Sequence, residues 1–254
     1  MARNPLGLNA APASNTAMNE ASVAELSYDR GLIAGADEDL HLSLNYAALQ
    51  DRPRLAALFA FMIELRRIPA SVSEAPLGEI RLQWHREALD EIVAAKRPRA
   101  HPVVTALANA VDVAAARPVL ETMIDARARL LYEPQFGSLG DFRAFIAAAE
   151  APLAVLSLGA ADPRHAAAAL GLGEAHALAR LAPALAPPLA NDAARAAMAL
   201  VAEHAPAMTS LSAEAFGRVA YLALARGHAK RPDGAAWPVM KRLALMKAVA
   251  TGRF

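Results

Sequence analysis

Apolar residues recur along this chain at the spacing of α-helices and not of β-strands. Residues three and four positions apart lie on the same face of a helix, so a run of such spacings predicts a helix with one buried side. Two neighbouring segments show this pattern clearly. The first carries Leu55, Leu58, Phe59, Met62 and Leu65, and the second carries Ile80, Trp84, Ala88 and Ile92. We therefore expect both segments to be helices, with Trp84 on the core face of the second.

Prolines mark several of the expected helix boundaries. Pro69 is expected to end the first helix, whereas Pro102 and Pro118 are expected to open the third and fourth, because proline suits a first turn and disrupts a helix interior. Pro152 is expected to kink the fifth helix. Three more helices are expected at residues 191–204, 212–228 and 236–250. No strand-like alternation or long repeat interrupts the series, so the predicted fold class is all-α, a single-domain helical bundle of about eight or nine helices.

The composition favours closely packed helices. Apolar residues make up 56% of the 254 residues and aromatic residues only 5%, because alanine supplies much of the apolar content. Alanine has the highest helix propensity and allows short distances between helix axes. A helical chain of this length usually stays undivided. We therefore expect one helical domain over residues 25–254, preceded by a flexible tail at residues 1–24.

The sequence also excludes several classes of protein. It has no cysteine, which rules out disulfides and cysteine-ligated metals. It has no apolar run of the roughly 18 residues that a membrane span needs, and no signal peptide, so we expect a cytoplasmic protein. Phosphate-binding, dinucleotide-binding and paired-histidine motifs are absent. The seven histidines are scattered and are expected to be surface or packing residues, Gly171 to Gly173 is expected to break a helix, and the net charge of +1 gives no indication of nucleic-acid binding.

Positive charge gathers near the carboxyl end of the sequence. From Ala215 onward there are eight Lys and Arg residues but one acid, Asp233. The last expected helix mixes basic Lys241, Arg242 and Lys247 with apolar Leu243, Met246 and Val249. Such a helix can lie on an anionic surface, or it can pack its apolar side into the domain and leave its lysines in water. We expect the second arrangement.

The stretch from Arg54, RLAALFAFMIELRRIPASVSEAPLGEIRLQWHREALDEI, resembles the opening of squalene/phytoene synthase family members. The similarity continues through His101-Pro102-Val103 and Met123-Ile124-Asp125-Ala126-Arg127 and weakens after about residue 175. It implies an isoprenoid-synthase-like helical fold. Catalytic members of this family carry a D-D-x-x-D cluster after the aliphatic-aromatic stretch, and a second acidic cluster on a facing helix. These carboxylates hold the Mg²⁺ that stabilises a leaving diphosphate.

The acidic residues of that pattern are missing here. Arg66, Arg67 and Ala70 stand at the three positions of the first cluster, and no acid occurs between Glu174 and Asp192, where the second is expected. Leu130 stands at the position of a further family aspartate. The resemblance therefore implies that the chain has no catalytic residues, no metal site and no cofactor, and that it is a pseudoenzyme.

One branch of the family resembles this chain more closely than the enzymes do. That branch includes the mitochondrial complex I assembly factor and bacterial homologues, and here Glu64-Leu65 and Val72-Ser73-Glu74 match its pattern. The resemblance implies a bacterial, non-catalytic binding or assembly protein that aids a respiratory membrane complex, with a protein partner and a place at the periphery of the inner membrane. Two alternatives stay open: a prenyl-diphosphate condensing enzyme, and a metal-free binder of a prenyl or lipid chain. The last requires an apolar cavity near residues 58–67 and 123–131.

Six residues are candidates for binding a ligand or partner: Arg66, Arg67, Glu64, Arg81, Trp84 and His85. The two arginines are able to hold a diphosphate, because guanidinium groups pair well with phosphate oxygens. The alternative, which we favour, is that they are solvated or paired with Glu64 or Glu74. Arg127 and Arg129 are likewise expected on a solvated face.

Overall fold

The computed structural model of the chain describes residues 27–159 and 163–254. Over these residues it contains α-helices and short 3-10 helices and no strand, so the predicted all-α class is confirmed. The expected count of eight or nine helices is wrong, because this part of the chain holds twelve α-helices, α2 to α13, after a helical stretch at residues 27–36. The expected tail at residues 1–24 lies outside the described residues.

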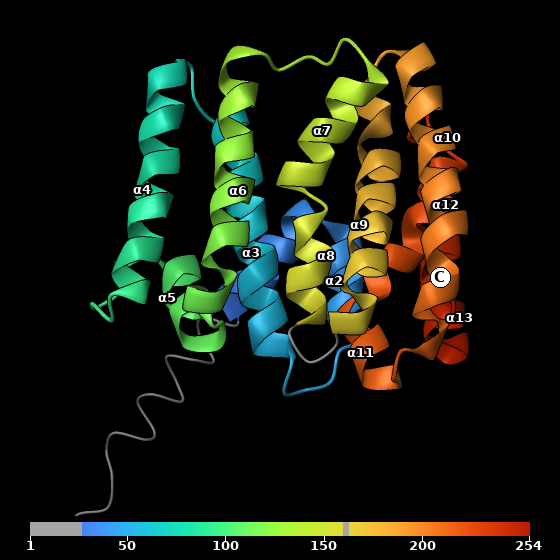
Figure 1. Cartoon of the computed structure of the whole chain (residues 1–254), viewed down its shortest axis with the longest axis horizontal. Helices are drawn as coiled ribbons and strands as arrows, with labels where there is room; N and C mark the ends of the chain where they lie inside the picture. Colours follow the sequence, from blue (N-terminus) through green and yellow to red (C-terminus); the bar gives the residue numbers. More distant parts are fainter. Residues whose placement is uncertain (1–26, 160–162) are drawn as a thin grey trace, which may run out of the picture.

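The helices form layers that run from α4 at one end to α13 at the other (Figure 1). Neighbouring contacts link α4, α6, α7, α9 and α10 in that order, while α3 packs behind α4, α6 and α8. Their bounds are α2 (Glu38–Leu44), α3 (Arg52–Ala70), α4 (Ala75–Val93), α5 (Pro102–Ala110), α6 (Val113–Tyr132), α7 (Leu139–Ala149), α8 (Pro152–Leu158), α9 (Ala166–Leu181), α10 (Pro187–His204), α11 (Ala213–Arg218), α12 (Ala225–Ala229) and α13 (Pro238–Thr251). None of them is both long and apolar enough to cross a bilayer.

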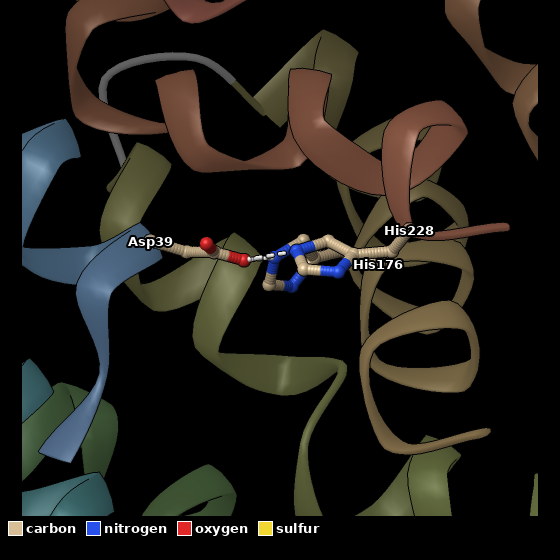
Figure 2. Close-up of side chains that lie close together, drawn as sticks. All are labelled: Asp39, His176 and His228. Carbon is tan, nitrogen blue, oxygen red and sulfur yellow. Dashed lines mark hydrogen bonds and ion pairs between the residues drawn. The ribbon is translucent and has the colours of Figure 1, made fainter. Parts of the chain in front are cut away.

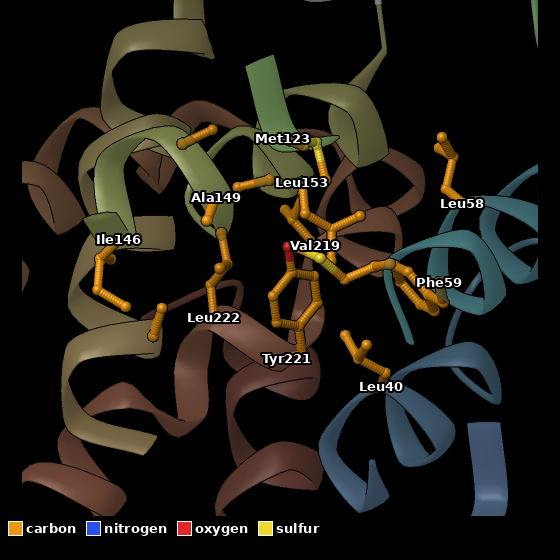
Figure 3. Close-up of a cluster of buried hydrophobic side chains, with 14 of the residues drawn as sticks. Leu40, Leu58, Phe59, Met123, Ile146, Ala149, Leu153, Val219, Tyr221 and Leu222 are labelled. Carbon is orange, nitrogen blue, oxygen red and sulfur yellow. The ribbon is translucent and has the colours of Figure 1, made fainter. Parts of the chain in front are cut away.

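Helix α3 is the centre of the core. Its residues 55–63 are each at most 2% exposed, so it is surrounded by other elements on all sides, as expected of a helix that is apolar all round. Figure 3 shows the cluster beside it, where Phe59 of α3, Leu40 of α2, Leu153 of α8 and Tyr221 of the 3-10 helix η4 (Ala220–Leu224) meet. The core therefore joins segments that are far apart in the sequence.

Three of the boundaries expected from prolines differ in the structure. Pro69 lies inside α3, which continues to Ala70, and Pro118 lies inside α6, which begins at Val113. The start of α6 is fixed by Asp112, whose side chain accepts a hydrogen bond from the backbone N–H of Ala115. Buried contacts along these helices outweigh the one backbone hydrogen bond that each proline removes. Pro152 begins α8 instead of kinking α7. The helix expected at residues 212–228 is divided into α11, η4 and α12.

The buried face of α4 also differs from the expected one. Ile80 is 65% exposed and Trp84 is half-buried, whereas Gly78, Leu82 and His85 face the interior. Gly78 explains this rotation, because a Cβ atom there would lie 2.2 Å from a methyl group of Leu131. The missing side chain lets α4 approach α6 along the glycine side, which turns Ile80 toward solvent.

Gly171 and Gly173 do not break a helix. Both lie inside α9, where small residues let neighbouring helices come close. A Cβ atom on Gly171 would meet the ring of His204, and one on Gly173 would lie 2.6 Å from the carbonyl oxygen of Ala151. The glycine pair is therefore a packing feature of α9.

We expect Gly173→Ala to lower the free energy of unfolding by about 1–3 kcal/mol, because α8 and α9 would have to separate to admit the methyl group. Gly31→Ala is the matched control, since a Cβ atom there meets nothing within 4 Å. The free energy of unfolding of the control should equal that of the parent or exceed it by up to about 1 kcal/mol, because alanine has a better helix propensity than glycine. Urea denaturation measures both. A Gly173→Ala variant as stable as the parent would contradict the close approach of α8 and α9.

Candidate functional site

Five charged side chains from five elements meet inside the bundle, and we call them the arginine–carboxylate network. They are Asp37 at the start of α2, Arg66 of α3, Arg127 of α6, Glu150 at the end of α7 and Arg180 of α9. Arg66 lies at its centre. Its Nη1 atom is 2.7 Å from Asp37 Oδ2, and its Nη2 atom is 2.5 Å from Glu150 Oε2. The network therefore ties the amino-terminal part of the bundle to α7 and α9.

The other two arginines complete the pairing of the same carboxylates. Arg127, only 1% exposed, donates from Nη2 to Glu150 Oε1 at 2.7 Å and to the carbonyl oxygen of Ala149 at 3.0 Å. Arg180 Nη1 lies 3.4 Å from Asp37 Oδ2. Burial raises the pKa of Glu150, but attraction to Arg66 and Arg127 outweighs burial and holds that pKa far below its usual range. The pKa of Asp37 is likewise lowered, because Arg180 and Arg66 together outweigh its burial.

These positions correct two expectations. Arg66 is neither solvated nor paired with Glu64 or Glu74, since its partners are Asp37 and Glu150, which are 29 and 84 residues away. Arg127 is buried instead of covering a solvated face, because Glu150 supplies a charged partner in the interior. Arg129 pairs with Asp141 at 2.7 Å and is partly exposed. Neither acid that binds Arg66 stands at a helical spacing from it, so sequence periodicity could not indicate them.

A second buried group, the Asp39 cluster, lies between α2, α9, α12 and α13. Figure 2 shows His176 of α9 and His228 of α12 pointing at the same carboxylate of Asp39. Asp39 Oδ2 accepts hydrogen bonds from their Nε2 atoms at 2.9 Å and 2.7 Å. Lys241 of α13 places its Nζ atom 2.8 Å from Asp39 Oδ1 and 2.9 Å from Glu38 Oε2. The histidines are scattered in the sequence and were expected to be surface or packing residues, because no local spacing brings residues 39, 176 and 228 together.

Electrostatics in this cluster keeps Asp39 ionised. Burial raises the pKa of Asp39, but hydrogen bonds from His176 and His228 outweigh it and hold that pKa well below the usual range. Burial lowers the pKa of Lys241, but the hydrogen bond to Asp39 and the attraction of that carboxylate reverse the effect and raise it. The pKa of His176 is lowered, chiefly because its ring is buried. The cluster thus contains a charged carboxylate and a charged ammonium group in direct contact.

The donor atoms of Asp39, His176 and His228 lie within 4.8 Å of one another, and such groups bind divalent transition metals. A metal ion here would have to displace the Nε2 protons that both histidines donate to Asp39. It would also lie beside the ammonium group of Lys241. We therefore interpret the cluster as a hydrogen-bonded ion pair that joins four helices.

The magnesium site of the catalytic family members does not fit the residues present. Arg66 and Arg67 present guanidinium groups and Ala70 a methyl group, so the first position offers no side-chain oxygen. The second position lies on α9, where residues 175–181 include no acid. Asp37 and Glu150 are the carboxylates nearest Arg66 in the network, and arginines already occupy their oxygen atoms.

The other five candidate residues gather in a different place. Glu64, Arg67, Arg81, Trp84 and His85 all line a hollow of about 410 Å³ between α3 and α4, together with Ile68, Ser71, Ile80 and His101. We call it the α3–α4 cleft. Arg66 and Arg67 separate because neighbouring residues on a helix point about 100° apart. The six candidate residues therefore lie at two separate sites: Arg66 in the arginine–carboxylate network and the other five at the α3–α4 cleft.

Polar contacts at the α3–α4 cleft are looser than those in the interior. Arg67 Nη1 lies 3.7 Å from Glu64 Oε1, as expected for that pair, and Arg81 Nη1 donates to Ser71 Oγ at 2.8 Å. The ring of Trp84 is in edge contact with His85, at 5.0 Å between centroids. Burial, with repulsion from neighbouring cations, lowers the pKa of His85 to about 4, so this ring is neutral at pH 7. The cleft thus joins an aromatic, uncharged floor to an arginine-bearing rim.

The space expected to form a lipid cavity contains a side chain. Arg127 extends from α6 toward α3, with its Nη2 atom 3.1 Å from Met62 Sδ and its guanidinium group over the ring of Phe145. An apolar pocket of about 470 Å³ lies instead beside the end of α6, where Leu130, Phe136, Phe142, Phe145, Leu181 and Leu185 are among its lining residues. A buried guanidinium group therefore lies between α3 and α6 where the apolar cavity was expected.

We expect Glu150→Gln to lower the free energy of unfolding by about 3–5 kcal/mol, because it leaves the buried Arg127 and the partly buried Arg66 without their shared acid. Asp125→Asn is the matched control. Asp125 also accepts from an arginine, Arg86, at 2.6 Å, but its side chain is 61% exposed. The control should change stability by less than about 1 kcal/mol. Equal effects of the two substitutions in urea denaturation would contradict the expectation that an unpaired arginine costs more in the interior than at the surface.

Two comparisons with known proteins agree with this architecture. The sequence model of the squalene/phytoene synthase family matches residues 33–187. The crystal structure of a dehydrosqualene synthase in complex with a ligand is similar in fold, with a TM-score of 0.65, 14% sequence identity, and coverage of 92% of this chain and 98% of that one. Among curated protein sequences, none matches the chain significantly. The family match covers more than half of the sequence, and the helical fold is shared over nearly its whole length. The chain therefore belongs to the squalene/phytoene synthase family.

Proposed function

We propose that this protein is a non-catalytic member of the family that acts by binding, as an assembly protein for a respiratory membrane complex. The assembly role rests on the resemblance of Glu64-Leu65 and Val72-Ser73-Glu74 to the non-catalytic branch. One observation carries the non-catalytic part of the proposal. Where the catalytic pattern requires an acid, Arg66 stands with its guanidinium group ion-paired to Asp37 and Glu150 inside the bundle. Its place of action in this proposal is the cytoplasm, at the periphery of the inner membrane.

The first argument is electrostatic. Loss of a diphosphate needs cations held by carboxylates beside the leaving group. A Mg²⁺ ion beside either Arg66 or Arg67 would meet a like charge, and two unit charges 4 Å apart already repel by about 1 kcal/mol in bulk water and by several times that in a partly buried cleft. Asp37 and Glu150 do not offset this repulsion, because their charged oxygen atoms are already ion-paired with Arg66, Arg127 and Arg180. Arginine binding of a diphosphate alone would hold ground state and transition state alike, and that gives no rate enhancement.

The second argument concerns the surface that remains available for a partner. At the α3–α4 cleft the side chain of Arg67 is 62% exposed, and Ile80 and half-buried Trp84 stand beside it. Tryptophan and arginine contribute more than other residues to the binding energy of protein interfaces. An exposed aliphatic residue next to them adds apolar area that a partner would cover. The cleft is thus the surface through which we expect a protein partner to bind.

We expect no prenyl transfer by the purified protein. The measurement is incubation with farnesyl or geranylgeranyl diphosphate, Mg²⁺ and NADPH, followed by extraction of hydrocarbon products. The triple variant Arg66→Asp, Arg67→Asp and Ala70→Asp should also be inactive, because α9 still lacks the second acidic group. Squalene or phytoene formed in a magnesium-dependent manner, above a heat-killed control, would overturn the non-catalytic assignment.

We expect a partner captured from cells by the tagged protein to be lost when the α3–α4 cleft is altered. The test variant is Ile80→Ala with Trp84→Ala, read by mass spectrometry of the proteins that co-purify. Leu49→Ala is the matched control, because Leu49 is a large exposed apolar residue outside the cleft. Circular dichroism confirms that each variant is folded. Retention of the same partner by the double variant, or its loss from the control, would show that the cleft is not the binding surface.

A further inference from the structure

The exposed side of α13 is apolar, which is the reverse of the arrangement expected from its sequence. Val239, Leu243 and Met246 are 65%, 45% and 54% exposed, and Ala250 is exposed on the next turn. These positions are spaced i, i+4, i+7 and i+11, so they form one continuous stripe along the helix. We call it the α13 stripe.

Lys241 explains why α13 has this orientation. Its side chain is turned inward to Asp39 and Glu38, and Leu245 and Ala248 lie on the same buried face. A charged lysine in the interior needs acidic partners, and the Asp39 cluster supplies them. With Lys241 directed inward, the opposite face of the helix is fixed toward solvent. The exposure of the stripe is therefore imposed by a buried ion pair.

Basic residues border the α13 stripe on both sides. At 100° per residue, Arg242 and Lys247 lie about 70° to either side of the centre of the stripe. Both are exposed, as is Arg253, although Arg242 also makes a long contact of 3.4 Å to Glu38. No acidic residue occurs in the sequence from Gly234 to Phe254. The charged residues of α13 itself are therefore all basic, and Glu38 of α2 contacts one of those at the border of the stripe.

This combination fits a lipid surface better than a protein surface. Protein interfaces contain fewer lysines than the rest of the surface, and their energetic centres are aromatic residues and arginine. The α13 stripe contains no aromatic residue, and one of the two basic residues at its borders is a lysine. Helices that lie in the plane of a bilayer have an apolar stripe that enters the headgroup region and flanking Lys and Arg residues that attract anionic lipids.

We propose that the α13 stripe, with Arg242 and Lys247 at its borders, binds the headgroup region of an anionic bilayer and docks the protein on the membrane. The proposal goes beyond the proposed function by naming the surface and the lipid chemistry, and it rests on that function only for the place of action. The rest of the bundle stays outside the bilayer, because Lys241 holds the inner face of α13 against Asp39.

The test uses the full-length protein in co-sedimentation with vesicles of phosphatidylcholine alone or with about one third phosphatidylglycerol. We expect binding to the anionic vesicles at least about tenfold tighter than to the neutral ones, and weaker at high salt, because each basic residue is attracted to the negative surface. Leu243→Ser with Met246→Ser, and separately Arg242→Gln with Lys247→Gln, should each reduce the affinity at least about tenfold.

Leu49→Ser with Lys96→Gln is the control, because both residues are exposed and lie in connections outside α13. It should bind the vesicles as the parent does. Since all four substituted side chains of α13 are exposed, circular dichroism should show every variant folded. The proposal fails if the parent does not bind anionic vesicles, if neutral vesicles bind equally well, or if either α13 variant binds like the control. It also fails if size-exclusion chromatography shows that the stripe joins two copies of the chain. None of these results would alter the expected lack of catalysis or the capture of a partner at the α3–α4 cleft.

Discussion

The pairing of buried carboxylates with arginines that reach into the interior is the constraint on which the rest of this structure depends. Asp37 and Glu150 lie in the interior as charged groups, and charged groups there require close partners. Arg66, Arg127 and Arg180 reach them from α3, α6 and α9. Such pairs add little net stability compared with apolar packing, but removing one partner is costly, so they fix which helices lie together.

The same requirement operates at the Asp39 cluster and decides a feature of the outer surface. Lys241 must face Asp39 and Glu38, and this sets the rotation of α13 about its axis. The apolar residues of α13 consequently lie outside, where they form a stripe bordered by basic residues. An interaction in the interior thus determines what the protein presents to its surroundings.

The fold of the squalene/phytoene synthase family is compatible with arginines inside the bundle. The helices keep their arrangement because the apolar core around α3 is retained. The region between α3 and α6 is filled by Arg127, and Arg66 is satisfied by acids from other helices. The helical fold accommodates Arg66 and Arg127 because acids from neighbouring segments balance their charges.

The sequence by itself determined the helical class and the family, because hydrophobic spacing and short motifs are local properties. It also indicated Glu64, Arg67, Arg81 and Trp84 as candidate binding residues. These four lie close together in the structure because they belong to consecutive helices joined by a short turn. It could not place Arg66 with Glu150, or Asp39 with His176 and His228, because these partners lie 84 to 189 residues apart. Only the tertiary structure decided which face of α4 and α13 is buried, since that depends on Gly78 meeting Leu131 and on Lys241 meeting Asp39.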